Sequence, residues 1–408
     1  MAEELAVWLY GQIVATIEAE RRRLRLRYTP EALARYPGGS PLLSLTLPVS
    51  SVQFGSSVVR PFLDGLLPEG DPRRAIAEEL GLRADDTFGL IQALGRDCAG
   101  AVVIQPAGDS GPPPGTTTTA EPLTDDRLAE LIANLRTVPL GADDRVRISL
   151  AGVQEKLLLT RLPDGRWGRP VDGTPSTHIL KPEIRGHPHT VENEVFCMRL
   201  ARHLGLPVAD VETIKVGDRS LIAVTRYDRR VDPEGVVERI HQEDLCQATG
   251  NPPAMKDQED GGPSLRVLAR ILSATDPGSL STLLRAVALH TLVGNGDAHG
   301  KNYSLLHEHS GALRMAPLYD VMSTLYYRDD RLAMYIDDVR RTDRVTTARI
   351  LNEASSWGMP RRTASEVIDD LLGKVPEAAG RALAETPGVP EEIRQIIDSQ
   401  LSRLRQPT

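Results

Sequence analysis

Cysteine is scarce in this chain of 408 residues. Its three cysteines, Cys98, Cys197 and Cys246, lie far apart, and no two of them form a C-x-x-C pair. A sparse, odd set of this kind excludes a disulfide framework and the cysteine-rich ligand set of a structural zinc site. We therefore expect all three to be buried thiols.

Long apolar runs are also absent. No stretch approaches the roughly eighteen apolar residues that a membrane-spanning helix needs. The first residues, Met-Ala-Glu-Glu-Leu-Ala, carry acid where a secretory signal would have a basic region followed by an apolar one. We expect a cytoplasmic protein with no membrane partner.

An excess of basic residues is missing as well. The chain has 48 Lys and Arg residues against 56 Asp and Glu residues, which gives a net charge of −8. Proteins whose main task is to grip a nucleic-acid backbone usually have a basic face. Direct DNA binding is therefore disfavoured as the main function.

The length of the chain, 408 residues, favours two or three domains.

A linker rich in Pro, Gly and Thr divides the chain at residues 106–122. Such a segment cannot bury enough apolar surface to offset the entropy of ordering it. Residues 1–105 form the first predicted domain. Apolar and polar residues alternate there over 24–28 and 43–47, which predicts half-buried strands, and a helix is predicted over 72–80.

The next predicted domain, residues 123–230, is rich in sheet. Thr124 is placed to cap a helix. A strand from Lys156 is expected to return through the turn 163–165 as a hairpin, and residues 177–181 read as a further strand. Together these segments predict the smaller lobe of a two-lobed protein.

The third predicted domain, residues 231–408, is mostly helical. Residues 283–293 are apolar on nearly every side, which is typical of a central buried helix. The segment from Pro390 places its apolar residues on one stripe, and a further helix is expected from Glu192 to the terminating Gly205. The sequence thus predicts an α+β, two-lobed, protein-kinase-like fold with a β-rich N-terminal subdomain and a large helical C-terminal lobe.

The segment 294–302, Gly-Asn-Gly-Asp-Ala-His-Gly-Lys-Asn, directly follows the apolar helix. Asp297 and Asn302 are five positions apart, as are the Asp and Asn of the kinase catalytic loop H-R-D-x-x-x-x-N. A carboxylate there orients the attacking hydroxyl and accepts its proton, while an amide oxygen holds Mg²⁺ on the phosphates. Lys301 would add positive charge where negative charge develops.

A predicted hairpin, 303–306 with 313–316, follows and leads to Asp320. In kinases the second metal-binding Asp also lies just past a hairpin, so Asp320 fits that position although Val and Met follow it in place of Phe-Gly. Mg²⁺ prefers oxygen ligands and keeps several waters, so Asn302 and Asp320 with phosphate oxygens are sufficient.

Lys181 ends an apolar strand, as the nucleotide-binding lysine of kinases does. The helix after it begins with Glu192 and Glu194, and either carboxylate could orient the lysine, with Glu194 slightly favoured. The segment 149–156 lies where a phosphate-covering loop belongs. It matches no general glycine-rich motif, but its small residues would let backbone N–H groups approach phosphate.

The chain resembles the HipA-type toxin kinases of type II toxin–antitoxin systems over nearly its full length. The resemblance in the kinase part rests on Ser149-Leu-Ala-Gly-Val-Gln-Glu-Lys156, Val224-Thr-Arg-Tyr-Asp-Arg229, His241-Gln-Glu-Asp-Leu-Cys-Gln247, Asn295-Gly-Asp-Ala-His-Gly-Lys-Asn302 and Pro317-Leu-Tyr-Asp320. Its N-terminal part is similar through Val7-Trp-Leu-Tyr-Gly11, Leu66-Leu-Pro-Glu-Gly70 and Gly95-Arg-Asp-Cys-Ala-Gly100.

This resemblance implies an ATP- and Mg²⁺-dependent serine/threonine-protein kinase with Asp297 as the catalytic base and with Asn302 and Asp320 as metal ligands. Ser149 matches the serine that the family autophosphorylates to silence itself, since added negative charge opposes ATP binding. The implied nucleotide-binding residues are Ala151, Gly152, Val153, Gln154, Glu155, Lys156, Lys181, the hinge Thr225, Arg226 and Tyr227, and His299, Gly300, Lys301, Asn302, Tyr319 and Asp320.

The resemblance also implies partners. One is a protein substrate related to translation, namely an aminoacyl-tRNA synthetase such as that for glutamate. The other is a small helix-turn-helix antitoxin of the HipB type, through which the chain would reach DNA mainly indirectly.

Two other functions stay open. A small-molecule kinase of the aminoglycoside or choline type shares the Asp/Asn spacing but lacks the N-terminal subdomain and the serine-bearing loop. An inactive module that serves only as a co-repressor is the other alternative. The complete set of Lys181, Asp297, Asn302 and Asp320 argues against it.

Overall fold

The structure, a computed structural model, describes residues 4–21, 23–109, 120–135, 154–171, 173–308 and 311–406. Internal packing divides the chain into two compact units. The first unit comprises Met1–Pro182, Lys215–Pro253 and His307–Gly311, and the second comprises Glu183–Ile214, Ala254–Leu306 and Ala312–Thr408. The domain boundaries at 105, 122 and 230 stay predictions.

The first unit begins with a four-stranded antiparallel sheet in the order β3-β2-β1-β4. Its strands and the helices that belong to the same region are β1 Glu4–Leu9, β2 Gln12–Glu20, β3 Arg23–Tyr28, β4 Val103–Pro106, α1 Pro30–Arg35, α2 Ser56–Leu66, α3 Gly70–Glu79 and α4 Thr87–Leu94. The predicted strand over 24–28 and the predicted helix over 72–80 are confirmed.

The strand predicted over 43–47 is wrong. Ser44 and Leu47 form only an isolated antiparallel bridge, and the surrounding segment is a loop. Leu43 and Leu47 are fully buried, but Leu45 between them is not, so the burial does not follow a strand's period of two. Side chains anchor the loop instead, because the Tyr28 hydroxyl donates to the Leu47 carbonyl at 2.6 Å.

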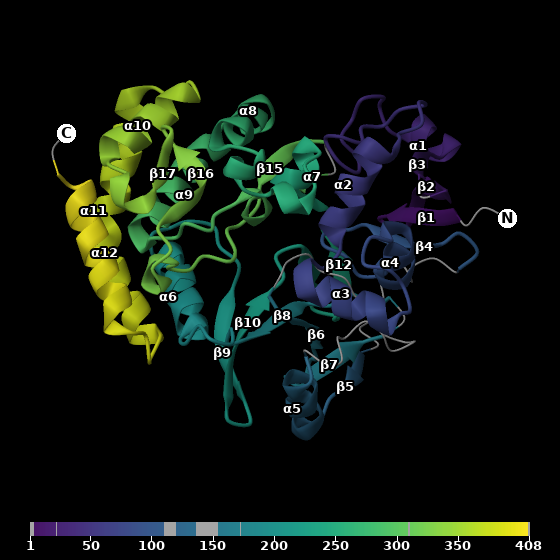
Figure 1. The fold of residues 1–408 in the computed structure, drawn as a ribbon, viewed down its shortest axis with the longest axis horizontal. Helices are drawn as coiled ribbons and strands as arrows, with labels where there is room; N and C mark the ends of the chain where they lie inside the picture. The colour runs from purple at the N-terminus through teal and green to yellow at the C-terminus, as the bar shows by residue number, and fades with distance from the viewer. Residues whose placement is uncertain are drawn as a thin grey trace. The chain divides into compact units, whose positions relative to one another are not determined.

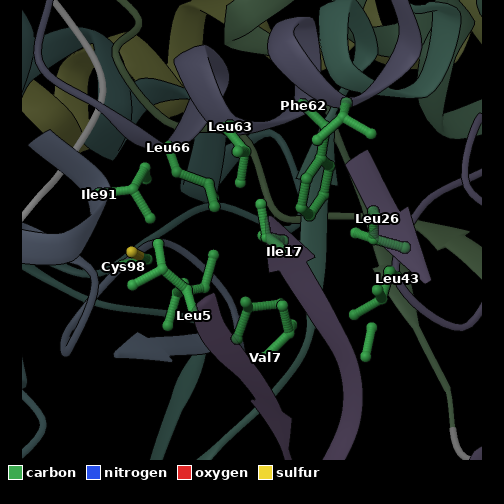
Figure 2. Close-up of a cluster of buried hydrophobic side chains, with 14 of the residues drawn as sticks. Leu5, Val7, Ile17, Leu26, Leu43, Phe62, Leu63, Leu66, Ile91 and Cys98 are labelled. Atoms are coloured by element: carbon green, nitrogen blue, oxygen red, sulfur yellow. The ribbon is translucent and has the colours of Figure 1, made fainter. Parts of the chain in front are cut away.

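One face of this sheet packs against α2 and α4. Figure 2 shows Leu5, Val7 and Ile17 of the sheet pointing toward Phe62 and Leu63 of α2. All of these side chains are almost fully buried. At about 25 cal/mol per Å² of apolar surface removed from water, such a core gives this region its own source of stability.

The first unit also contains most of a six-stranded sheet in the order β5-β7-β6-β8-β10-β9, whose strands are labelled in Figure 1. The boundary between the two units falls within β9, after Ile214. Its elements and the short ones after it are β5 Ala120–Pro122, α5 Asp125–Ala133, β6 Leu157–Arg161, β7 Trp167–Pro170, β8 His178–Pro182, β9 Val211–Val216, β10 Arg219–Thr225, β11 Arg229–Val231, β12 Val237–Arg239, β13 Gln242–Asp244 and α7 Leu245–Thr249. The predicted hairpin, the strand over 177–181 and the Thr124 cap, whose side chain accepts from the Arg127 amide, are confirmed.

The second unit is mostly helical, with four short strands. These elements are α6 Thr190–His203, α8 Leu265–Thr275, α9 Ser279–Val293, β14 Ser304–His307, β15 Leu313–Met315, β16 Arg331–Ile336, β17 Val339–Arg341, α10 Thr347–Ser356, α11 Arg361–Glu385 and α12 Glu391–Leu404, joined by the 3-10 turns η1 Pro253–Met255, η2 Gln258–Asp260, η3 Gly300–Asn302, η4 Leu325–Tyr327 and η5 Thr342–Arg344. Helix α9 packs against α8, α10, α11 and α12, which confirms the predicted central buried helix. The helices predicted from Glu192 and from Pro390 are also present.

Cys98, Cys197 and Cys246 are buried free thiols, as expected. Across the part of the chain that the structure describes, none of the helices has the length and apolar character required to traverse a bilayer.

Candidate active site

The loop that carries Asp297 is fixed at the end of α9. Gly294 closes the helix in the left-handed conformation (φ 66°), and its N–H donates to the carbonyls of His290 and Thr291. A Cβ atom at Gly296 would lie 1.9 Å from the Arg331 carbonyl oxygen, so only glycine fits there. The loop is therefore tightly constrained immediately before the candidate catalytic residue.

Asp297 and Asn302 are joined within this loop. The Asn302 side-chain N–H donates to the Asp297 carbonyl at 2.9 Å, and the Asn302 N–H donates to the His299 carbonyl at the same distance. Asn302 is only 8% exposed, whereas the side chain of Asp297 is 61% exposed. The loop thus buries the side-chain amide of Asn302 and exposes the carboxylate of Asp297.

The predicted hairpin positions Asp320. Ala316, just after β15, donates its N–H to the Ser304 carbonyl in β14 at 2.9 Å. The Tyr319 hydroxyl donates to the Lys301 carbonyl at 2.6 Å and lies 2.7 Å from Ser304 Oγ. Asp320 itself adopts a left-handed conformation (φ 59°), which is uncommon outside glycine and marks a sharp turn of the chain.

Electrostatics connect Asp297 with Asp320. The surrounding protein partly desolvates the Asp297 carboxylate and thereby raises its pKa to about 6, and the negative charge of Asp320 adds to this effect. Lys256 opposes it by favouring the ionised carboxylate. A carboxylate with a raised pKa beside a second carboxylate is typical of a functional site, because structural carboxylates are usually paired with cations.

His299 is almost completely buried beside this carboxylate. Its Nε2 atom lies 3.9 Å from Asp297 Oδ1, and burial lowers the pKa of the imidazole to about 3. Among the described residues, its Nδ1 atom has no hydrogen-bond partner. The ring is therefore neutral at physiological pH and can line the site without adding charge.

Three residues near Asp297 were not identified from the sequence: Lys256, Asp257 and Asp329. The Gly300 N–H donates to the Lys256 carbonyl at 3.0 Å, which ties the segment 253–262 to the catalytic loop. The negative charges of Asp257 and Asp329 raise the pKa of Asp297 further. The segment around Lys256 has neither helical nor strand periodicity, so only the fold could associate it with the site.

The residues of the second unit fit a magnesium ion. Asn302 and Asp320 supply the amide and carboxylate oxygens that Mg²⁺ prefers. Repulsion from Asp320 adds to the desolvation that raises the pKa of Asp297, and this repulsion favours a cation there, because a bound cation would relieve it.

The other predicted phosphate-binding residues lie in the first unit. Lys181 is 7% exposed near the end of β8, where its backbone pairs with Ile222 of β10. The Gln154 amide donates to the Pro182 carbonyl at 3.4 Å, so the segment that includes Glu155 and Lys156 approaches the end of the same strand. Ser149, Ala151, Gly152 and Val153 lie outside the described residues.

The orienting glutamates belong to the second unit. Glu194 is 3% exposed on α6. Glu192 lies two residues nearer the start of this helix, and its Oε2 atom has no hydrogen-bond partner among the described residues. The choice between them as the partner of Lys181 stays open.

The predicted hinge lies at the end of β10. Thr225 pairs with His178 of β8, and the Arg226 N–H donates to the Thr177 carbonyl at 2.9 Å. The Tyr227 hydroxyl donates to the Gln242 side chain. The Arg226 guanidinium is buried and bonded to Asp228, so any contact of this residue with adenine would have to come from its main chain.

Two family models match the chain. The model of the HipA-like C-terminal domain matches residues 148–379, and the model of the HipA N-terminal domain matches residues 5–105. Their order along the chain is that of the sequence blocks described above.

Individual proteins are similar over most of their lengths. The putative kinase Y4mE of Sinorhizobium fredii is 39% identical over 404 residues, covering 94% of this chain and 92% of that protein. The serine/threonine-protein kinase toxin HipA of Shewanella oneidensis is 32% identical over 373 residues, covering 87% of this chain and 84% of that protein.

A solved structure is similar as well. It is the complex of HipA, HipB and operator DNA from the Shewanella oneidensis toxin–antitoxin system. Its match has a TM-score of 0.83 and 27% identity and covers 98% of this chain and 95% of that chain. The predicted α+β, kinase-like fold is thereby confirmed.

Proposed function

Because this chain belongs to the HipA family of kinases, we propose that it transfers the γ-phosphate of ATP to a serine or threonine of a cytoplasmic protein. The observation that supports this proposal is the exposed Asp297 carboxylate with its raised pKa, to which the charge of Asp320 contributes and whose main-chain carbonyl accepts a hydrogen bond from Asn302.

Asp297 is the general base in this proposal. Its carboxylate would orient the substrate hydroxyl and accept its proton as the oxygen bonds to phosphorus and the bond to the ADP leaving oxygen breaks. The hydrogen bond from Asn302 to the Asp297 carbonyl keeps the loop, and hence the carboxylate, in one orientation. A pKa of about 6 leaves this base mostly ionised at pH 7 and still able to take a proton.

Asn302 and Asp320 would hold Mg²⁺, which would neutralise charge on the phosphate oxygens. Lys301 and the neutral His299 would line the phosphate site. In the first unit, Lys181 and the segment 151–156 would contact the phosphates, and residues 225–227 would contact adenine.

Labelled ATP tests the proposal directly. The purified chain should transfer label to protein, and Asp297→Ala should not. Label transferred instead to an added aminoglycoside would identify a small-molecule kinase. No transfer at all by the folded wild-type chain, with Mg²⁺ and ATP present, would contradict the proposal.

We further propose that the substrate belongs to translation and is an aminoacyl-tRNA synthetase, such as that for glutamate. The support is the family membership alone. Phosphoproteomics of cells that express the wild-type chain, compared with cells that express Asp297→Ala, would identify the substrate. Absence of any synthetase among the differing phosphosites would contradict this part of the proposal.

Self-silencing through Ser149 is a separate proposal. Phosphorylation would add about two negative charges beside a site that must bind ATP. Ser149→Ala should therefore remain active during preincubation with ATP, whereas the wild-type chain should lose activity. Equal loss of activity in both would refute this role.

We propose a small helix-turn-helix antitoxin of the HipB type as the partner that brings the chain to DNA. The similarity to the chain in the complex of HipA, HipB and operator DNA supports this. Growth arrest on expression of the chain, relieved by Asp297→Ala or by the neighbouring antitoxin, is expected of a toxin. Arrest that persists with Asp297→Ala would mean that kinase activity is not its cause.

A further inference from the structure

The second unit contains a cavity of about 570 Å³ outside the residues considered above. It lies between the start of α12, the turn η4 and Pro188 of the segment that precedes α6. Figure 1 labels α12 and α6. The turn η4 begins five residues after Asp320, so the cavity borders the chain segment that leaves the candidate metal site.

Two hydrogen bonds join the segment 324–325 at this cavity to the loop of the catalytic base. The Leu325 N–H donates to the Gly294 carbonyl at 2.9 Å. The Gly296 N–H donates to Thr324 Oγ1 at 2.8 Å. A group bound on η4 would thus rest on the same rigid framework that positions Asp297, which adjoins Gly296.

The walls of the cavity are aromatic and aliphatic. The rings of Tyr326 and Tyr327 meet edge to face, with 4.9 Å between their centroids. The Tyr327 hydroxyl donates to the Pro188 carbonyl at 3.0 Å, which fixes the segment before α6 against η4. Ile396 of α12 completes the apolar surface. Such walls suit a large apolar side chain.

The rim carries one charge of each sign. Arg328 and Glu392 are both exposed, and within the described ranges neither has an ion-pair partner. Arg328 adopts a left-handed conformation (φ 66°) at the end of η4. These two side chains are available to charges of the opposite sign on a bound molecule.

We propose that this cavity docks the protein substrate through the extended segment next to its phosphorylated serine or threonine. An apolar side chain of that segment would enter between Tyr326 and Ile396, and an acidic neighbour would pair with Arg328. This inference rests on the proposed kinase function and names the surface by which that function selects its substrate.

A macromolecular segment fits this cavity better than a small molecule does. Sites for small molecules bury most of the surface of their ligand. Here Arg328, Glu392 and Ser399 are exposed, and the cavity is an open depression on the surface of the unit. Apolar anchors with a polar rim and an arginine are typical of protein–protein contacts.

Ser399→Trp tests the inference by filling the cavity from an exposed position without removing any core side chain. Its matched control is Ser402→Trp, which is exposed on the same helix but does not line the cavity. Both variants and the wild-type full chain would be given a heat-treated bacterial lysate and ATPγS, and thiophosphorylated lysate proteins would be quantified. Binding of a fluorescent ATP analogue and self-labelling serve as measurements of the active site itself.

We expect Ser399→Trp to reduce labelling of lysate proteins at least tenfold, with ATP-analogue binding and self-labelling within twofold of wild type. Ser402→Trp should behave as wild type in all three measurements. Arg328→Glu should reduce labelling of lysate proteins in the same selective way.

Equal labelling of lysate proteins by Ser399→Trp and the wild-type chain would overturn the docking inference alone. Parallel loss of self-labelling would also overturn it, because the cavity would then serve catalysis or folding. No labelling of any protein by the wild-type chain would overturn the proposed function, and the docking inference with it.

Discussion

Aspartates in two regions of this chain have opposite pKa shifts. In the first unit, Asp97 and Asp228 are almost fully buried, yet both have a pKa below the usual value. In the second unit, Asp297 is exposed and has a pKa raised to about 6. The pKa of Asp297 is raised first by desolvation and then by neighbouring carboxylates, whereas arginines lower the pKa values of the buried pair against their own desolvation.

Arginines surround the buried pair. Burial by itself would raise the pKa of Asp97, but Arg229 and Arg226 outweigh it. Arg229 Nη2 lies 2.9 Å from Asp97 Oδ1, and Arg226 Nη2 lies 2.8 Å from Asp228 Oδ2. Hydrogen bonds from Ser176 to Asp97 and from Gly100 to Asp228 complete the network.

Asp297 lacks that compensation. Desolvation is the largest cause of its raised pKa, and three carboxylates add to it. In the part of the chain that the structure describes, Lys256 is the only cation that contributes notably in the opposite direction. Removing one partner from a buried ion pair destabilises a fold, whereas a carboxylate among like charges itself costs stability and is typical of a functional site. The comparison therefore separates the compensated carboxylates of the buried network from the uncompensated carboxylate that we propose as the general base.

The largest expected effect concerns Asp297. Asp297→Ala should lower phosphoryl transfer by about 10²- to 10⁴-fold, the usual contribution of a general base. Its thermal midpoint should not fall, because an exposed side chain surrounded by like charges does not support the core. Labelled-ATP transfer and thermal unfolding measure the two quantities. Asp369→Ala, at an exposed position on α11, is the matched control and should leave both unchanged. A parallel loss of stability and activity would mean that Asp297 supports the fold, as Asp97 and Asp228 do.

Asp228→Ala should show the opposite pattern. It leaves Arg226 and Arg229 buried without one carboxylate, which should lower the free energy of unfolding by about 3–5 kcal/mol. Urea unfolding followed by tryptophan fluorescence measures this loss. Asp218→Ala, at an exposed turn between β9 and β10, should change stability by less than about 0.5 kcal/mol. A loss below about 1 kcal/mol for Asp228→Ala would mean that the network adds little to the fold.

The lowered pKa values of Asp97 and Asp228 also predict the pH range in which the buried network loses its contribution to stability. A carboxylate with a lowered pKa stabilises the fold fully above its unfolded value, near 4, and loses that contribution only at more acidic pH. The contribution of Asp97 and Asp228 should therefore be constant from about pH 5 to pH 8. A steep fall of stability between pH 7 and pH 5 would contradict the assigned charges.

Much of the fold was predictable because the relevant signals are local. Gly294 follows an apolar segment and ends α9, and Thr124 precedes an acidic helical turn and caps α5. The Asp297–Asn302 spacing placed both residues on one loop, and the structure joins them there. Each of these inferences needed only neighbours in the sequence.

Properties that depend on distant contacts were not predictable. Arg226 lies in a block that resembles a nucleotide-binding hinge, but its side chain bonds to Asp228 and to the Cys98 carbonyl. Lys256 is 41 positions before Asp297, in a segment without periodicity, and becomes its neighbour only through the fold. Apolar and polar residue types alternate over 43–47 and predicted a strand, but contacts made by the folded loop decide which of them are buried, and Leu45 is not.

The pH dependence of activity gives a smaller effect. Because the pKa of Asp297 is about 6, kcat/KM should be constant above pH 7 and fall about tenfold between pH 6.5 and pH 5 as the base is protonated. The fold should survive this change. A raised carboxyl pKa means that the folded state binds protons more readily, so protonation of Asp297 stabilises it between about pH 6 and pH 4. Initial rates and thermal midpoints in the same buffers separate the two effects, and a flat rate profile down to pH 5 would remove Asp297 as the base.

Lys256→Met gives the smallest and most specific effect. Its positive charge favours the ionised form of Asp297, so its removal should raise the pKa of that carboxyl and shift the acid limb of kcat/KM to higher pH. Activity should fall by roughly twofold more at pH 6 than at pH 8. Lys374→Met is the matched control, because its ammonium pairs with the exposed Asp370 on α11. A uniform loss at every pH would instead mean that Lys256 acts on the phosphates. An unchanged pH profile would mean that the charge of Lys256 does not act on Asp297. The charged neighbours that shift the pKa of Asp297 would then be Asp320, Asp257 and Asp329 alone.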